Sequence, residues 1–141
     1  MTAKSRNGQS LLEFALVLPL LLIVTFGIVE FGILMYDKAV ITNASREGAR
    51  LGIVARDRSD LAAIQSEIQS TVSDYAASYL ITFGSGVGAL EIPAPVFSGS
   101  TFGSTVTVTA RYTYEFLVLP RLVASVTGPV VFEATTVMKL E

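Results

Sequence analysis

Carboxylates are the side chains best suited to chemistry in this chain, because it contains no cysteine and no histidine. Their absence removes thiolate and imidazole metal sites, Cys or Ser/His nucleophile systems and haem ligation. The acidic residues that could form an acid–base pair in the C-terminal half are Glu91, Glu115 and Glu133, and they share no recognisable catalytic spacing. We therefore expect no catalytic residue, no cofactor or metal site, no small-molecule substrate and no enzymatic activity.

Glu13 has the most unusual surroundings of these carboxylates. It lies in GQSLLEF, Gly8 to Phe14, which leads into the apolar run of residues 14–36, whose single charge is Glu30. As a helix this run would be roughly 34 Å long, enough to cross a hydrocarbon core of about 30 Å. A carboxylate at the centre of such a helix costs about 2.5–3.5 kcal/mol on insertion scales, and less near its ends. We therefore predict a transmembrane helix over 14–36 and a partner for Glu13, for which an amine is the natural choice.

Composition and charge support a membrane anchor. The chain is 51% hydrophobic and 16% charged, and its net charge of -2 offers no basic surface for nucleic acid. A cleaved secretory signal is the alternative, but no small-x-small cleavage site follows the apolar run. Lys4 and Arg6 favour a cytoplasmic N-terminus, whereas basic residues from Lys38 onward favour the opposite, so charge leaves the orientation open. Pro19 is expected to kink the helix.

Helical periodicity continues beyond the apolar run and predicts one helix over residues 9–55. Small and apolar residues recur at spacings of three and four through Ile41, Ala44, Gly48, Leu51 and Ala55. The other faces are expected to carry Asp37, Lys38, Arg46, Glu47 and Arg50. Two interpretations remain open for Arg46, Glu47, Gly48 and Arg50: a solvated helix face, or a contact with a sister subunit or with the protein's own head.

Residues 56–141 are predicted to form a small head, which gives an α+β fold with a long N-terminal helix. RDRSD, residues 56–60, is a polar break in which Asp57 or Ser59 could cap an amphipathic helix that contains Tyr75 and Tyr79 as core residues. Residues 84–104 are predicted to be a connection with at most a short edge strand near residues 90–92. Strict alternation over residues 104–114 and 130–139 predicts two strands of a short antiparallel sheet, joined by an apolar loop over residues 116–123.

Two segments carry a resemblance to a known family. The basic leader, Gly8, four residues, Glu13, an aromatic residue and an apolar helix resemble the processing site of type IV pilin-like proteins. GQSLLEFALVLPLLLIVTFGIVEFG and ITNASREGARLGIV resemble the TadE-like family of the tight adherence pilus system, and the two C-terminal strands resemble that family's pattern more loosely. Phe14 stands where many pilins of this system have tyrosine.

The resemblance implies a function and a location. A prepilin peptidase would remove leader residues 1–8 by cutting between Gly8 and Gln9, and Glu13, with Phe14 beside it, would then make an assembly contact with the new amine of Gln9 or of a neighbouring subunit. The expected function is that of a pseudopilin or minor pilin in pilus assembly, with other pilin-like subunits, the assembly machinery and membrane lipid as partners. The expected location is the bacterial inner membrane, with the head outside the cytoplasm, and also an extracellular pilus. The alternative is a generic single-pass envelope protein whose head binds another envelope component.

Overall fold

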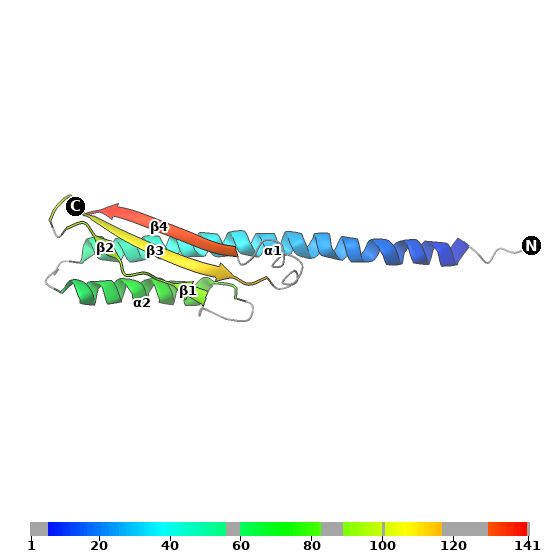
Figure 1. Ribbon diagram of the computed structural model, residues 1–141, viewed down its shortest axis with the longest axis horizontal. Coiled ribbons are helices and arrows are strands. Elements are labelled where there is room, and N and C mark those ends of the chain that lie inside the picture. Colours follow the sequence, from blue (N-terminus) through cyan, green and yellow to red (C-terminus); the bar gives the residue numbers. More distant parts are fainter. Residues whose placement is uncertain (1–5, 56–59, 83–88, 100, 117–129, 141) are drawn as a thin grey trace, which may run out of the picture.

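The computed structural model of the chain describes residues 6–55, 60–82, 89–99, 101–116 and 130–140. It consists of a 49-residue helix, α1 (Arg6–Val54), and a head formed by a second helix and a four-stranded antiparallel sheet. Figure 1 shows the N-terminal half of α1 projecting from the head, whereas its C-terminal half lies along the head. The predicted α+β fold is confirmed.

The second helix, α2 (Leu61–Tyr79), begins after α1 ends at Val54 and runs back along it. Its N-cap is Asp60, whose carboxylate accepts a hydrogen bond from the backbone N–H of Ala63 at 3.0 Å. The prediction of Asp57 or Ser59 as the cap was therefore wrong, although the polar break was placed correctly. The buried residues of α2 repeat at intervals of four and face α1 and the sheet; they are Ile64, Ile68, Val72 and Ala76.

The sheet is built around one central strand, β3 (Thr105–Tyr114). Strand β4 (Val130–Lys139) pairs with all ten residues of β3, from Thr105 opposite Lys139 to Tyr114 opposite Val130. The other edge of β3 pairs with two short strands, β1 (Leu90–Glu91) and β2 (Val96–Phe97). The edge strand near residues 90–92 was predicted and β2 was not. The apolar loop predicted over residues 116–123 lies, except for Phe116, outside the described residues.

The hydrophobic core lies between the sheet and the two helices. Alternate residues of β3 are buried, as the alternation predicted, and they meet small residues on α1. Gly48 is one of these, because a Cβ atom at this position would lie 2.5 Å from Val72 Cγ2 and 3.2 Å from Ile68 Cγ2. The backbone of α1 therefore approaches α2 more closely than any larger residue at position 48 would allow.

Polar contacts join the sheet to α1 and the connection between β1 and β2 to α2. Ser45 of α1 is fully buried, and its hydroxyl lies 2.7 Å from that of Thr136 on β4. On α2, the side-chain amides of Gln65 and Gln69 donate to the carbonyl oxygens of Pro95 and Ile92, each at 2.8 Å. These two bonds hold the connection between β1 and β2 against α2 by satisfying carbonyl groups that no strand pairs.

Candidate processing and assembly site

The predicted processing segment forms the first turns of α1. Gly8 and Gln9 are exposed, and nothing lies within 4 Å of a Cβ atom built on Gly8. The N–H groups of a first helical turn have no partner within the helix, so this segment can unwind at little cost. One turn further, the Gln9 side-chain amide donates to the Glu13 carboxylate at 3.2 Å. Gln9 and Glu13 therefore share one face of the helix.

The N-terminal half of α1 is bare, meaning that no other described element of the chain packs against it. Every side chain from Gly8 to Val29 is exposed except Gly27, and the large apolar ones include Phe14 at 61% and Leu16 at 73%. Among the described residues, one helix is long and apolar enough to cross a membrane, and its apolar stretch lies near the N-terminus in this unpacked part. The helix continues through Pro19. A kink at Pro19 stays a prediction.

The head begins to cover α1 at Glu30, inside the range predicted to span a membrane. Glu30 is 4% exposed and Asp37 is fully buried. The two are seven residues apart, which places them two turns apart on the face that packs against the head. Asp37 was predicted on another face of the helix, and this was wrong. Its position four residues before Ile41, on the predicted apolar stripe, was the signal that could have identified it.

These two carboxylates lie near two buried tyrosines of β3. One oxygen of Asp37, Oδ1, accepts a hydrogen bond from the backbone N–H of Ile81 at 3.0 Å, and the other, Oδ2, is buried without a hydrogen bond from the described residues. Burial raises the pKa of Asp37 above its ordinary value of 3.8, and the bond from Ile81 opposes this in part. Burial, with the nearby charges of Glu30 and Asp37, raises the pKa of Tyr114 to about 12. Its hydroxyl is also buried, with no hydrogen-bond partner in the described part of the chain.

The second predicted contact segment, Arg46 to Arg50, lies near the opposite end of α1, roughly 50 Å from Phe14. Gly48 is buried against the head, so for this residue the contact with the protein's own head is the one observed. Arg46 and Arg50 remain exposed. Arg50 donates to both oxygens of Glu47, at 2.6 and 3.0 Å, which lowers the pKa of Glu47.

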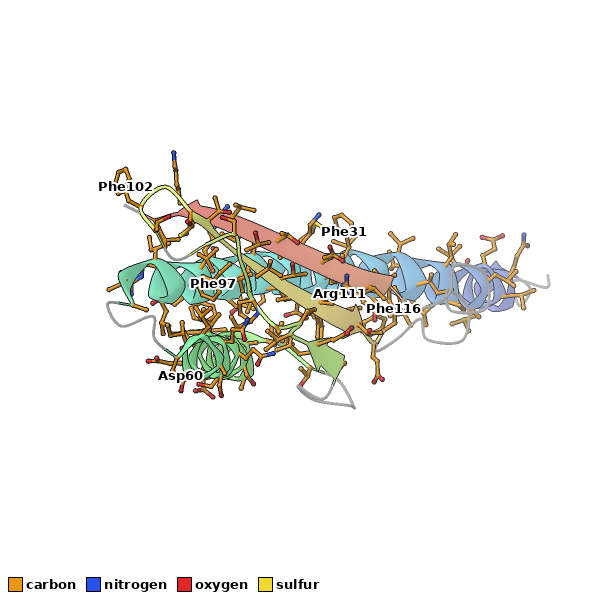
Figure 2. The ribbon with its side chains drawn as sticks, turned by 60° about the vertical axis from the view of Figure 1, so that its left-hand side comes forward. Phe31, Asp60, Phe97, Phe102, Arg111 and Phe116 are labelled. Atoms are coloured by element: carbon orange, nitrogen blue, oxygen red, sulfur yellow. The ribbon has the colours of Figure 1, made fainter. Side chains whose placement is uncertain are left out.

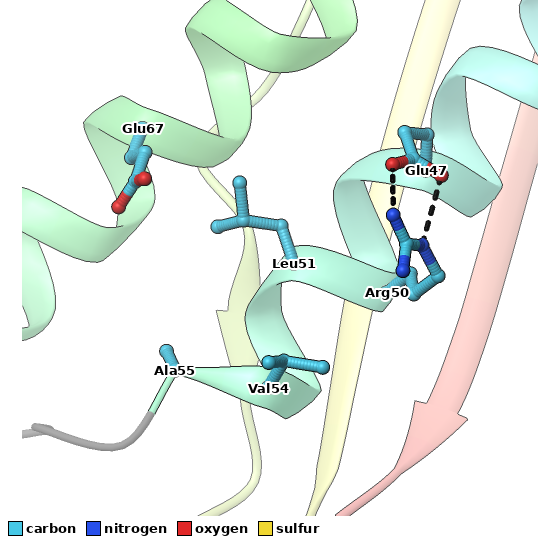
Figure 3. Close-up of a pocket in the computed structure, with 6 residues that line it drawn as sticks. All are labelled: Glu47, Arg50, Leu51, Val54, Ala55 and Glu67. Atoms are coloured by element: carbon cyan, nitrogen blue, oxygen red, sulfur yellow. Dashed lines mark hydrogen bonds and ion pairs between the residues drawn. The ribbon is translucent and has the colours of Figure 1, made fainter.

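A hollow of about 300 Å³ opens beside this ion pair, between the end of α1 and α2 (Figure 3). Leu51, Val54 and Ala55 provide its apolar lining, and Glu67 faces them from α2. With two carboxylates and one guanidinium, the lining carries one net negative charge. Of its two carboxylates, Glu47 is paired with Arg50, and Glu67 comes from the other helix.

The sheet brings Glu91 and Glu133, two of the three acidic residues considered as an acid–base pair, into one cross-strand row. Arg111 on β3 stands opposite Glu91 on β1 and opposite Glu133 on β4, and its guanidinium donates to Glu133 at 2.8 Å. Figure 2 labels Arg111, which lies on the outer face of the sheet. Glu115 is exposed beyond the end of β3. Glu91 and Glu133 therefore flank a cation, as in a cross-strand ion-pair ladder.

The fold and the bare helix define a class: a small α+β head carried on a single N-terminal helix suited to single-pass membrane anchoring. The family model described as TadE-like protein matches residues 8–50, which confirms the resemblance found in the sequence over that range. The match begins at Gly8 and ends at Arg50, so it covers the bare half of α1 and most of the part against the head. No curated protein and no solved structure matches the chain.

Proposed function

We propose that this chain is a pilin-like structural component that acts in assembly of a tight adherence pilus, after removal of residues 1–8 by a prepilin peptidase. The observation that carries the proposal is the TadE-like match over residues 8–50, which starts at the glycine of the processing motif. The TadE-like match supports a pilus association, and the finer role of a minor pilin or pseudopilin is the proposed part. The head would lie outside the cytoplasm, above the inner membrane.

The geometry of the first turns supports cleavage between Gly8 and Gln9. A peptidase must bind its substrate in an extended form, and the start of a helix is the part that unwinds most easily. Gly8 contacts no neighbouring side chain, so unwinding there breaks no packing. Cleavage would leave Gln9 as the first residue, with a positive amine one helical turn from Glu13.

Glu13 would then neutralise an amine within the apolar part of an assembly. An ion pair is strong where the dielectric constant is low, and removing one partner leaves the other charge buried alone. The amine is either that of the same chain or that of a neighbouring subunit. Since Phe14 and the apolar residues after it are exposed, packing of bare helices from several copies would supply the apolar surroundings.

Replacing Gly8 with alanine is expected to abolish processing. The family motif requires glycine before the cleaved bond, and a Cβ at this position changes nothing else, because it meets no atom within 4 Å. The measurement is the intact mass and N-terminal sequence of the protein from membranes of its native host, with and without the prepilin peptidase. Normal mature protein starting at Gln9 in the Gly8→Ala variant would contradict the proposed site.

Gly27→Ala is the matched control, because Gly27 lies in the same bare helix and a Cβ there also meets nothing within 4 Å. This variant should be processed normally. A wild-type chain that keeps its first eight residues in both strains would remove the pilin-like route and favour the generic envelope protein.

Replacing Glu13 with glutamine is expected to preserve membrane insertion and to reduce pilus assembly at least about tenfold, since 1.4 kcal/mol already changes an equilibrium by that factor. The amide keeps an acceptor for Gln9 and removes only the charge that would pair with an amine. Glu91→Gln is the control, since Glu91 is exposed on the head. The measurements are the processed fraction in membranes and the amount of sheared pilus. Undiminished pilus in Glu13→Gln would make this carboxylate incidental.

A further inference from the structure

We propose that the near end of the head, meaning Tyr36 on α1 together with Tyr79 and Ile81 at the end of α2, sits in the lipid headgroup layer of the membrane that α1 crosses. The partner of this surface is therefore the lipid itself. The inference concerns the chain as it stands in the membrane, and it holds for a pilin-like protein and for a generic envelope protein alike.

The spacing of exposed charges along α1 sets the depth of the head. Between Glu13 and the exposed Lys38 there are 24 positions, all described, and the only charged residues among them are Glu30 and Asp37, both buried by the head. These positions make about 36 Å of helix, against a hydrocarbon core of about 30 Å and a whole bilayer of about 40–45 Å. The uncharged outer surface is therefore only slightly longer than the membrane core.

The head cannot stand clear of a membrane placed in this way. It begins to cover α1 at Glu30, which lies eight positions, or about 12 Å of helix, before Lys38. The helix is continuous through this point, without a linker that could lift the head away. Figure 1 shows the ends of β3 and α2 lying beside the middle of α1. The bond from the Ile81 N–H to Asp37 fixes the end of α2 at the same level.

The exposed side chains at this level suit the boundary between lipid and water. On the side of α1 away from the carboxylates, Phe31 is 62% exposed, Met35 41% and Tyr36 45%. Tyr79, the last residue of α2, is 53% exposed, and Ile81, just beyond the helix, is 40% exposed. The prediction that Tyr79 is a core residue was therefore wrong. Tyrosine is enriched at membrane interfaces, because its ring favours lipid and its hydroxyl favours water. Lys38 follows directly as a cation that phosphate headgroups attract.

The same arrangement explains how Glu30 occurs within the predicted span of residues 14–36 and how Asp37 occurs directly after it. A carboxylate facing lipid is costly, and Glu30 and Asp37 avoid lipid because the head covers their side of the helix while apolar residues face outward. Seating the head in the headgroup layer therefore keeps both carboxylates covered by protein at a depth where lipid would otherwise reach them.

Single tryptophan probes can measure this depth, because the chain contains no tryptophan. The full chain, carrying Tyr79→Trp, Phe26→Trp or Phe102→Trp, is reconstituted in phosphatidylcholine vesicles that contain either headgroup spin-labelled or acyl-chain brominated phosphatidylcholine. Phe26 lies in the bare half of α1, and Phe102, 85% exposed, lies at the far end of the head (Figure 2). Vesicles in which brominated lipid quenches Phe26→Trp contain inserted protein and are used for the comparison.

We expect the headgroup label to remove most of the Tyr79→Trp fluorescence and to leave Phe102→Trp almost unchanged. Equal, weak quenching of Tyr79→Trp and Phe102→Trp would overturn the proposal, because the head would then stand in water. A Tyr79→Trp emission that is shifted to shorter wavelength without quenching would also overturn it, since a second copy of the chain would then cover this surface. The same comparison with Ile81→Trp tests whether the whole end of α2 lies at this depth.

Discussion

Replacing Gly48 with leucine is expected to lower the free energy of unfolding of the head by about 3 kcal/mol or more, because overpacking a tight core costs typically 1–3 kcal/mol for smaller insertions. The Cβ atom alone would lie 2.5 Å from Val72 Cγ2. Because the β-branched Val72 side chain has one strongly preferred rotamer in a helix, it cannot move aside as a flexible side chain would. The measurement is urea unfolding of the full chain in detergent micelles, followed by the near-ultraviolet circular dichroism of the tyrosines of the head.

Gly32→Leu is the matched control for this change. Gly32 lies on the same helix, and a Cβ atom there meets nothing within 4 Å, so this variant should unfold at the urea concentration of the wild type. If Gly48→Leu and Gly32→Leu were equally stable, α2 would not pack on Gly48 in solution. Gly48 would then be available to a sister subunit, which is the alternative that the sequence left open for residues 46–50.

The elements that could be predicted from the sequence are those whose pattern is imposed by one dominant contact. The bare half of α1 was predictable because lipid-like composition over residues 14–29 requires no knowledge of the rest of the chain. Strand β3 was predictable because one face is buried and the other is not, which forces a period of two. Strand β2 was not predictable, because its two residues, Val96 and Phe97, form a strand only by pairing with the edge of β3.

Some residues of the candidate site could likewise be selected from local sequence, and others needed the structure. Gly8 and Glu13 were selected by their spacing from an apolar run, which is a local signal. The apolar stripe of α1 could have placed Asp37 on the buried face, but its hydrogen bond from the Ile81 N–H spans a sequence distance of 44 residues, which no local pattern encodes. For Gly48 the sequence left a solvated face and a contact both open, and only the structure shows that Val72 and Ile68 are its neighbours.

The bare half of α1 and the head are joined rigidly, because the rest of α1 is part of the core of the head. Residues from Glu30 to Gly52 of α1 contribute both to the helix and to the core of the head, so the head cannot rotate relative to the bare helix without losing that core. Packing of bare helices in an assembly would therefore also fix the positions of the heads. If Glu13 makes the proposed assembly contact, this would couple it, at one end of the helix, to the surface that the heads present at the other.

Replacing Asp37 with asparagine is expected to raise the free energy of unfolding at neutral pH by on the order of 1 kcal/mol or more, because burying an ion costs several kcal/mol and a neutral amide costs less. The amide oxygen keeps an acceptor for the Ile81 N–H. Burial raises the pKa of Asp37 in the folded state, so the folded chain binds a proton more tightly than the unfolded chain. Wild-type stability from this group should therefore be fully present below pH 3.8 and decline as the pH rises through the raised pKa.

The asparagine variant should lose this part of the pH dependence. Asp74→Asn is the control, because Asp74 is exposed on α2 and its replacement changes the net charge equally without uncovering a buried group. Asp37→Ala separates the two roles of the side chain: it also removes the charge but leaves the Ile81 N–H without its acceptor, so it should be less stable than Asp37→Asn by about 1–3 kcal/mol. Unfolding of each full-length variant in micelles between acidic and neutral pH makes the comparison. Identical pH profiles for the wild type and Asp37→Asn would mean that the head does not desolvate this carboxylate, and the depth assigned to the head would lose one of its supports.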